Sequence, residues 1–532
     1  MQQPLNGKLD TPGFSRRDLL RGGAVLTLPA LMGVEALAAP VTAATTVADV
    51  YGPIGVKPII NGRGTYTILS GSIMLPEVRA AMAAAAQRYV HLDELAEAIG
   101  ARLAELTKAE WGLVTVGCSA ALTHASAACV AGGNPDLHVR IPNLAGFPKD
   151  EAIIPKHSRN VYDAAVRAVG MRVIEVETVA ELEAAFGPRT AVVYILAGPN
   201  VEESPLTTRV IAERANARGV PVLVDAAAEV LTIPNVHLEA GAALVAYSGG
   251  KCLRGPQTGG LLLGRKDLVK AAWVSSAPHH GFGRSMKVGK EEAIGMLTAV
   301  EMWTKRDHDA EWKRWTSWLD FIAHRVSAID DVTTSVEQPT GLSNRTPSLQ
   351  VLWPRERFGI DGGWVVRELF TTDPRVALFP AERGKDASRT GVSVTPYMLV
   401  PGEEKVIADR LYAILSKPPR QEPAAVGPPA ADLSGQWDVR IEYASNVSHH
   451  TLHLRQRGNV LDGAHQGDFV TRDLQGSIDR DVVVVRSNYN EEHGDALGYT
   501  FSGKVAGDRM NGTLDMGEYL SARWSAERHA KA

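Results

Sequence analysis

A lysine in a glycine-rich turn is the residue with the clearest chemical potential. Lys251 lies in the stretch ALVAYSGGKCLRGPQTGGLLLG, which predicts two short apolar strands joined by a turn that contains Gly250 and Gly255. Upstream, the stretch VPVLVDAAAE is typical of a buried strand that ends at Asp225. A lysine amine can form a Schiff base with the aldehyde of pyridoxal 5'-phosphate (PLP), while an aspartate keeps the pyridine nitrogen protonated. We therefore predict that Lys251 and Asp225 hold PLP; the alternative is an ordinary turn lysine and an ordinary strand-end aspartate.

A phosphate-binding site is expected where a strand meets a helix of small residues. The stretch WGLVTVGCSAALTHASAACVAGG predicts a strand that ends at Gly117 and a helix that begins at Cys118 or Ser119. Backbone N–H groups at a helix N-terminus favour an anion, and the small side chains of Ser119 and Ala120 allow a phosphate to approach. The stretch contains no GxGxxG or Walker motif, so a plain strand-to-helix turn is the alternative.

Two further residues are suited to contact a planar ring. The stretch EAIIPKHSRNVYD predicts a strand followed by His157, whose imidazole can stack on the PLP ring. A histidine that caps the next helix is the alternative. In VDAAAE, Ala227 is small enough to lie beneath a ring, where a bulkier side chain would collide.

An alternation of strands and helices must position these residues. From about Val50 to Ser416 the pattern is typical of a mostly parallel α/β sheet followed by a small α/β domain. Helices are predicted over 75–87, 93–107, 205–218 and 291–326. Between them, PHHGFGRSMKVGK carries Arg284, Lys287 and Lys290 at helical spacing, as a basic cluster or as a solvated face.

The last hundred or so residues have a different pattern. A proline-rich linker over 417–431 precedes alternating strands with Gly, Asp and Asn turns, which predict a small antiparallel β-barrel or sandwich over 432–532. The histidines of HHTLH lie in one of these strands, and we predict an ordinary half-exposed strand there rather than a metal site. We therefore divide the chain into a segment over 1–44, a large PLP-binding domain over 45–330, a small domain over 331–416, the linker and the β domain.

The N-terminus predicts export. SRRDLLR is followed by the apolar run GGAVLTLPALMGVEALAA, and it resembles a twin-arginine signal with Arg16 and Arg17 at the expected places. A basic amphipathic helix is the alternative. We expect cleavage between Ala38 and Ala44, and a protein exported in folded form to the periplasm.

Composition excludes several classes of partner. The 532 residues carry a net charge of -4 and no basic block, which argues against nucleic-acid binding. The cysteines are three, Cys118, Cys129 and Cys252, and an odd count in a long chain argues against a disulfide framework. No CxxC or paired Cys/His spacing indicates a metal site. No apolar run after the N-terminus is long enough to predict a membrane span.

From about Tyr51 to Ser416 the chain resembles the fold-type I PLP enzymes, in the aminotransferase class V-like branch of selenocysteine synthase and D-glucosaminate-6-phosphate ammonia lyase. The resemblance rests on six segments in a fixed order: INGRGTYT with GSIMLPEV, VTVGCSAALTHA, KHSRNVYD, PVLVDAAAE, SGGKCLRGPQTGG and GRSMKVGKEE. It implies a Schiff base at Lys251, a pyridinium partner at Asp225, ring stacking by His157, and a homodimer or a higher homo-oligomer. Phosphate contacts are implied at Gly117, Cys118, Ser119, Ala120 and Ser248. Candidate substrate contacts are Arg63, Thr67, Arg284 and Lys287.

The resemblance implies an enzyme but not its reaction. We expect α,β-elimination of the ammonia-lyase type on an amino acid or amino-sugar acid, through a Lys251 aldimine. A PLP-dependent aminotransferase is one alternative, and a periplasmic binding or sensory protein with lapsed PLP chemistry is another. The signal stands where selenocysteine synthase has a tRNA-binding domain, which argues against selenium transfer.

Overall fold

The protein is described by a computed structural model that covers residues 49–381, 388–419, 426–490 and 496–530. The chain divides into two units, Met1–Lys57 and Pro58–Ala532. The described part of the first unit contains the 3-10 turn Gly52–Ile54, and the predicted export signal lies outside the described residues. All elements below belong to the second unit.

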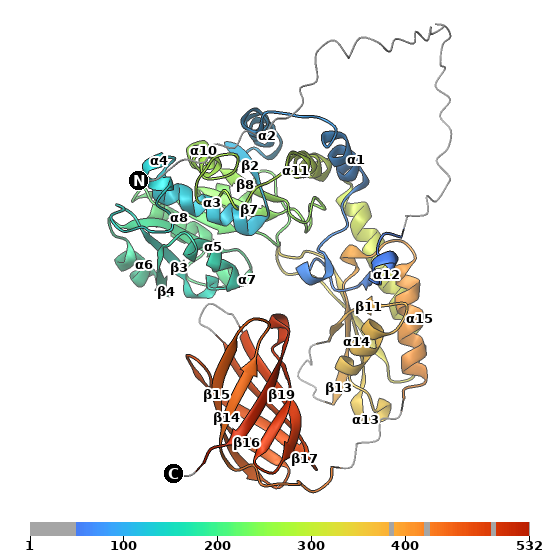
Figure 1. The fold of residues 1–532 in the computed structure, drawn as a ribbon. Coiled ribbons are helices and arrows are strands. Elements are labelled where there is room, and N and C mark those ends of the chain that lie inside the picture. The colour runs from blue at the N-terminus through green and yellow to red at the C-terminus, as the bar shows by residue number, and fades with distance from the viewer. Residues whose placement is uncertain (1–48, 382–387, 420–425, 491–495, 531–532) are drawn as a thin grey trace, which may run out of the picture. The chain divides into compact units, whose positions relative to one another are not determined.

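A seven-stranded sheet forms the centre of the first and larger α/β part (Figure 1). The strand order is β2 (Trp111–Thr115), β8 (Gly260–Gly264), β7 (Leu244–Ser248), β6 (Val222–Asp225), β5 (Thr190–Leu196), β3 (Glu151–Pro155) and β4 (Arg172–Val176). Strand β8 runs antiparallel to both of its neighbours, and the pairs from β7 to β4 are parallel. The runs VLVD and LVAYS are apolar on both faces because helices cover both sides of a parallel sheet.

Two apolar cores form where helices pack on the sheet. One core contains Leu103 of α2 (Leu92–Thr107), Leu182 of α6 (Val179–Ala185), Ile211 of α8 (Thr208–Asn216) and Met296 of α11 (Lys290–Trp303). The other contains Leu122 of α3 (Cys118–Ala131), Val166 of α5 (Ala164–Arg167) and Val269 of α10 (Lys266–Val274). The shorter helices are α1 (Pro76–Ala85), α4 (Pro135–His138), α7 (Pro199–Glu202) and α9 (Val236–Glu239).

A smaller α/β arrangement follows. Its antiparallel sheet has the order β12 (Phe379–Pro380), β13 (Arg389–Val394), β10 (Ser348–Pro354) and β9 (Thr333–Glu337). The helices are α12 (His308–Val326), α13 (Arg355–Phe358), α14 (Gly362–Thr371) and α15 (Glu403–Ser416). The fully buried Trp353 lies in the core between sheet and helices. Strand β1 (Ile60–Asn61), near the start of the unit, pairs in parallel with β11 (Val376–Ala377).

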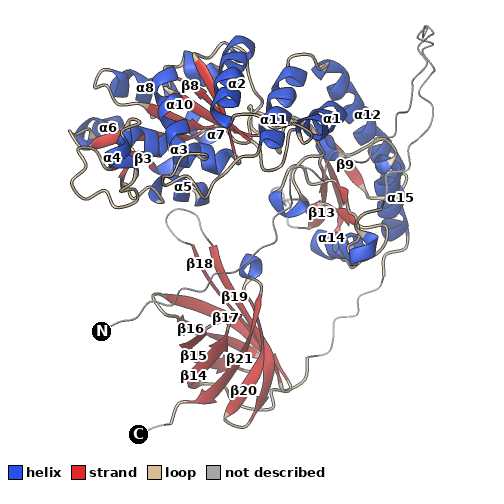
Figure 2. Cartoon of the chain, turned by 45° about the horizontal axis from the view of Figure 1, so that its top comes forward, coloured by secondary structure: helices blue, strands red, loops and turns tan. Residues whose placement is uncertain are grey.

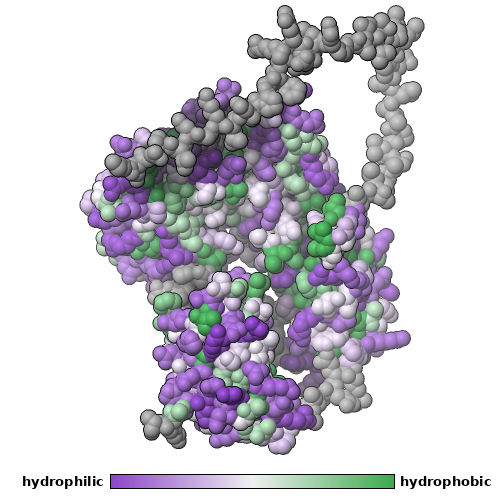
Figure 3. Space-filling model, viewed as in Figure 1, coloured by the Kyte–Doolittle hydropathy of each residue, from purple (hydrophilic) through white to green (hydrophobic). Residues whose placement is uncertain are grey.

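The C-terminal part is a closed eight-stranded antiparallel barrel (Figure 2). Its strands are β14 (Gly435–Glu442), β15 (Val447–Arg457), β16 (Val460–Gln466), β17 (Thr471–Asp479), β18 (Val482–Asn490), β19 (Ala496–Ala506), β20 (Arg509–Asp515) and β21 (Ser521–Arg528). Burial alternates along strands such as β14, β15 and β21, and the face visible in Figure 3 is mainly hydrophilic. Pairing of β14 with β21 closes the sheet, so the β domain is a barrel and not a sandwich.

The structure confirms the predicted fold class: a mostly parallel sheet with a small α/β part and an additional antiparallel β domain. It differs from two local predictions. Arg284 and Lys287 lie in an irregular loop and not on a helix, because Pro278, Gly281, Gly283 and Gly289 interrupt any helical run before α11. The helix predicted over 291–326 is two helices, separated between Trp303 and His308. Within the described ranges, no helix combines the length and the apolar character that crossing a membrane requires.

Candidate active site

Three predicted site segments meet at one edge of the large sheet. Strands β6 and β7 are parallel, and β2 is parallel to β7 because both are antiparallel to β8. The carboxyl ends of all three strands therefore lie at the same edge, where ligands of α/β sheets bind. Asp225 ends β6, Ser248 ends β7 just before Lys251, and Gly117 follows β2. Lys251 and Ser248 are half-buried, and Asp225 is only 2% exposed.

The Asp225 carboxylate accepts hydrogen bonds from three donors. Its Oδ1 accepts from the Ala227 backbone N–H at 3.0 Å and from Cys118 Sγ at 3.6 Å, and its Oδ2 accepts from the Tyr194 hydroxyl at 3.1 Å. Burial raises the pKa of the Asp225 carboxyl above its ordinary value, and the Ala227 N–H, the Tyr194 hydroxyl and the Lys251 amine act in the opposite direction. Burial likewise raises the pKa of the Cys118 thiol, which therefore stays protonated as a donor.

This arrangement fits the PLP pyridine nitrogen. None of the described cationic side chains forms an ion pair with Asp225, although the carboxylate is buried. A buried carboxylate without a counter-charge is costly, and a protonated pyridine nitrogen would supply that charge.

The start of α3 fits a phosphate. Gly117 has φ 91°, a conformation that L side chains rarely adopt, and no described side chain caps the helix. The first backbone hydrogen bond of the helix runs from the Ala121 N–H to the Gly117 carbonyl. The N–H groups of Cys118, Ser119 and Ala120 precede it and remain available for an anion.

Close backbone contacts shape the Lys251 turn. The Gly249 N–H donates to the Gly259 carbonyl at 2.7 Å, and the Gly255 N–H donates to the Gly249 carbonyl at 2.8 Å. A Cβ on Gly249 would lie 2.6 Å from the Met296 sulfur and 2.8 Å from the Gly259 carbonyl oxygen, so glycine is required there. The turn is also held from outside, since Arg306 Nη1 donates to the Cys252 carbonyl at 2.9 Å. Lys251 is thus fixed at its backbone while its side chain remains half-buried.

His157 lies in the 3-10 turn Lys156–Ser158, directly after β3. Its Nδ1 is 3.1 Å from the Ser158 hydroxyl oxygen, and its buried Nε2 has no hydrogen-bond partner within the described ranges. Burial lowers the pKa of the His157 imidazole, which favours the neutral ring. The turn is linked to Asp225, because Asn160 Nδ2 donates to the Ser158 carbonyl at 2.7 Å and to the Tyr194 hydroxyl oxygen at 3.1 Å.

Two residues of this hydrogen-bond network, Tyr194 and Asn160, are not among the site residues predicted from the sequence. Tyr194 is fully buried in the otherwise aliphatic strand TAVVYIL. A buried tyrosine hydroxyl needs a partner, and this could have marked the residue, although the identity of the partner could not be read from the sequence.

The predicted substrate residues lie in different surroundings. Arg63 is half-buried, with its guanidinium carbon 4.2 Å from the centre of the Phe379 ring. It lines a pocket of about 350 Å³ together with Asn344 and Tyr397, whereas Thr67 is exposed and does not line that pocket. Arg284 and Lys287 are exposed in the loop before α11.

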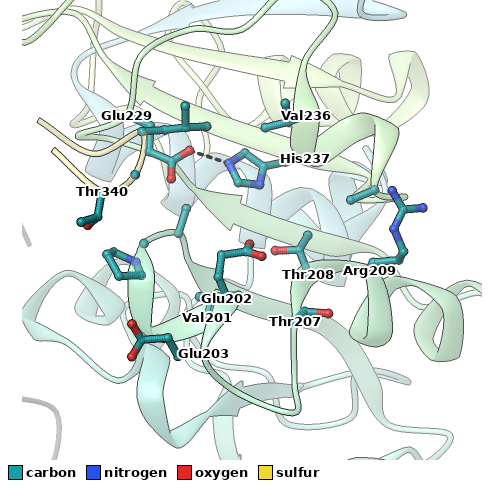
Figure 4. Close-up of a pocket in the computed structure, with 16 residues that line it drawn as sticks. Val201, Glu202, Glu203, Thr207, Thr208, Arg209, Glu229, Val236, His237 and Thr340 are labelled. Carbon is teal, nitrogen blue, oxygen red and sulfur yellow. Dashed lines mark hydrogen bonds and ion pairs between the residues drawn. The ribbon is translucent and has the colours of Figure 1, made fainter. Parts of the chain in front are cut away.

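A larger pocket of about 580 Å³ is lined by neither Lys251 nor Asp225 (Figure 4). On one wall, the buried His237 Nε2 lies 2.6 Å from the Glu229 carboxylate. Glu202 and Thr208 point toward each other across the pocket from this pair. Cys252 Sγ donates to the Glu229 carbonyl at 3.2 Å, so this wall contacts the residue next to Lys251.

Comparison with known proteins agrees with this geometry. The family model for aminotransferase class-V matches residues 155–338. A D-glucosaminate-6-phosphate ammonia lyase from Salmonella typhimurium is 31% identical over 299 residues, which cover 54% of this chain and 78% of the relative. A 5'-C-glycyluridine monooxygenase-decarboxylase from Streptomyces sp is 30% identical over 393 residues, which cover 69% of this chain and 92% of the relative.

The solved structure of D-glucosaminate-6-phosphate ammonia-lyase superposes with a TM-score of 0.61 at 27% identity, over 69% of this chain and 98% of that one. A more distant relative is the L-seryl-tRNA(Sec) selenium transferase of Moorella thermoacetica, 27% identical over 346 residues, which cover 58% of this chain and 66% of the relative. These proteins share the PLP-dependent fold, and the buried Asp225, the Lys251 turn and the start of α3 match what the cofactor needs. The chain is therefore an enzyme that belongs to the PLP-dependent aminotransferase class-V family.

Proposed function

We propose that the chain is a PLP-dependent lyase that removes ammonia from an amino acid or amino-sugar acid by α,β-elimination. The observation that carries the proposal is the buried Asp225 carboxylate with three donors, at the same sheet edge as Lys251. The lyase reaction, rather than another PLP reaction, is supported by the 31% identical ammonia lyase.

The residues have distinct roles in this proposal. Bound PLP supplies an electron sink for the substrate Cα. The Lys251 amine takes the proton from Cα, and Asp225 holds a proton at the pyridine nitrogen. The free N–H groups of Cys118, Ser119 and Ala120 would orient the phosphate of bound PLP, and the neutral His157 would stack on its ring.

The remaining steps are ordinary elimination chemistry. Loss of the Cα proton and of a β-hydroxyl releases water. Hydrolysis of the resulting enamine releases ammonia and leaves a 2-keto acid. Arg63, which lines the neighbouring pocket, is suited to bind the substrate carboxylate because its buried Nε has no partner among the described atoms.

The test is ammonia release by the purified holoenzyme from a panel of amino acids and amino-sugar acids, with no keto acid added. The wild type is expected to release ammonia, Lys251→Ala is expected to release none, and the exposed Lys305→Ala serves as the matched control. Nitrogen transfer that requires an added keto acid would establish an aminotransferase instead. Absence of both reactions in a protein that binds PLP would favour a binding or sensory role.

A further inference from the structure

One end of the barrel interior is polar. Inward-facing positions on β15 to β19 at this end form a group that we call the polar belt, which consists of Ser448, His450, His465, Arg472, Ser487 and Tyr499. Arg472 stands directly opposite His465 across β16 and β17, and Tyr499 stands opposite Ser487 across β18 and β19. Other inward positions on these strands are apolar, such as Leu461 and Ile478. The belt is therefore a distinct surface inside the barrel.

A chain of hydrogen bonds holds the two histidines of the belt. His450 Nε2 lies 3.4 Å from Asp468 Oδ2, His450 Nδ1 lies 2.8 Å from His465 Nε2, and His465 Nδ1 lies 2.7 Å from the Ser487 hydroxyl oxygen. Ser448 donates to the other oxygen of Asp468. Burial lowers the pKa of His450, and it lowers the pKa of His465 to about 3. Both rings are therefore neutral near pH 7, and every ring nitrogen already has a partner.

Arg472 differs from its neighbours because two of its three guanidinium nitrogens have no hydrogen-bond partner among the described residues. The residue is 7% exposed, and its Nε and Nη1 have no hydrogen-bond partner in the part of the chain that the structure describes. The guanidinium carbon lies 4.8 Å from the centre of the Tyr499 ring and 5.9 Å from that of Tyr489. The nearby Asp468 already accepts from Ser448 and His450. A buried cation with unused N–H groups is costly, and native structures seldom keep one without a ligand.

We propose that the polar belt binds a small organic carboxylate, with Arg472 as its anchor. A planar guanidinium matches a carboxylate in both shape and charge. Arg472 is the single positive charge of the belt, and this favours a monoanion over a phosphate dianion. The half-buried rings of Tyr443, Tyr489 and Tyr499 offer apolar contact to the rest of the ligand. The interior of a closed eight-stranded barrel is either filled by its own side chains or able to hold one small ligand, so a small carboxylate is the size of ligand to test.

The test is isothermal titration calorimetry of the full-length holoenzyme with benzoate. The wild type is expected to bind benzoate, and Arg472→Gln is expected to weaken binding by about tenfold or more, since a charge-assisted hydrogen bond is lost. Arg486→Gln is the matched control, because Arg486 is exposed on the outer face of β18. This variant should bind benzoate with the same affinity as the wild type. Benzyl alcohol, the neutral analogue, should not bind at Arg472.

Additional measurements separate the belt from the PLP site and from a folding defect. Binding at the PLP site would alter the cofactor absorbance and would persist in Arg472→Gln. The thermal midpoint of Arg472→Gln without ligand should equal or exceed that of the wild type, because the variant removes an unpaired buried charge. If Arg472→Gln does not fold, Arg472→Lys keeps the charge but loses the planar donor pair, and it should also weaken binding. Equal benzoate affinity in the wild type and the Arg472 variants, no benzoate binding at all, or tighter binding of inorganic phosphate than of benzoate through Arg472 would each overturn the proposal.

Discussion

At the scale of single residues, Asp225 determines how the cofactor site works. Its carboxylate is almost fully buried, and all of its described partners are neutral donors. Such a carboxylate favours a cationic ligand strongly, because it has lost its hydration and forms no ion pair with the described residues. We therefore expect Asp225 to keep the pyridine nitrogen of PLP protonated, and to contribute less to the binding of PLP.

Replacing Asp225 with alanine should leave PLP bound and reduce turnover roughly 30- to 150-fold, since a charge-assisted hydrogen bond contributes about 2–3 kcal/mol. Tyr194→Phe should have a smaller effect of about three- to tenfold, because it removes one neutral hydrogen bond to the same carboxylate. Turnover and the visible absorption of the cofactor are the measurements.

Tyr247→Phe is the matched control for Tyr194→Phe. Tyr247 is buried on β7, its hydroxyl oxygen accepts from Asn235 at 2.7 Å, and it packs in a different apolar core from Tyr194. Its loss should lower stability without changing turnover. Equal turnover in the wild type and in Asp225→Ala would show that this carboxylate does not act on the pyridine nitrogen.

At the scale of elements, the start of α3 depends on a backbone conformation that glycine provides. Gly117→Ala should weaken PLP binding and destabilise the fold by about 1–3 kcal/mol, because alanine is strained at this φ of 91°. The PLP dissociation constant and the urea midpoint are the measurements. Gly132→Ala, at φ 58° at the other end of the same helix, should cost stability without affecting PLP affinity. If Gly117→Ala binds PLP as tightly as the wild type does, the phosphate of PLP does not bind at this end of α3.

The barrel should be sensitive to acid through His465. Burial lowers the pKa of His465 from its ordinary value of about 6.5 to about 3, so the unfolded chain binds the proton more readily. The contribution of His465 to the free energy of unfolding is fully present above about pH 6.5 and is lost as the pH falls toward 3. At pH 5 the free energy of unfolding should be lower by about 2 kcal/mol. His465→Gln should lose this dependence, whereas His453→Gln, which replaces an exposed histidine of β15, should keep it. Urea unfolding at pH 7 and pH 5 gives the change in the free energy of unfolding between the two pH values. An equal change in the wild type and in His465→Gln would show that His465 is not the residue responsible.

At the scale of the whole molecule, the β-barrel carries its own connection to the preceding chain. The Gly427 N–H donates to Asp479 Oδ1, the Ala430 N–H donates to the Arg480 carbonyl, and Asn459 Nδ2 donates to the Gly427 carbonyl. The residues just before β14 are therefore bonded to the barrel and belong with it in any dissection of the chain.

A chain that ends at Pro419 should fold, bind PLP and form the dimer that the family resemblance implies. The reason is that all the segments of the PLP site, and the apolar cores that support them, lie before that residue. Visible absorption, sedimentation and turnover of the truncated and full-length proteins are the measurements. Retained PLP with lost turnover would instead assign the barrel a part in substrate binding. Loss of PLP or unfolding would show that the two parts are not separable.

We also propose that the segment with Arg16 and Arg17 directs export; it lies outside the described residues. Changing Arg16 and Arg17 together to lysine should leave the precursor in the cytoplasm, because receptor-read signals depend on the guanidinium groups and not on charge alone. Arg21→Lys is the matched control and should be exported normally. Fractionation of cells that produce each variant measures the outcome, and normal export of the double variant would indicate another route.

Much of the fold could be predicted because its signals are local. The spacing of apolar residues places strands such as β6 and β7, and glycines mark the turns at Gly117 and Lys251. The order of these segments also indicates that Asp225 ends one parallel strand and that Lys251 follows the next. Both residues are thereby brought to one edge of a sheet. Residue type and chain order are sufficient for this, because strand ends in parallel sheets converge.

Contacts between distant segments could not be predicted in this way. The bonds of Asp225 to Tyr194 and Cys118 depend on which strands and helices become neighbours, and the sequence pattern is compatible with several orders. In the β domain the same alternation suits a sandwich or a barrel, and only the pairing of β14 with β21 closes it. That closure places one face of each strand inside, and so it buries His450 and Arg472 while His449 and His453 remain at the surface. A strand has two faces with equal local geometry, and only the tertiary structure determines which of them is enclosed.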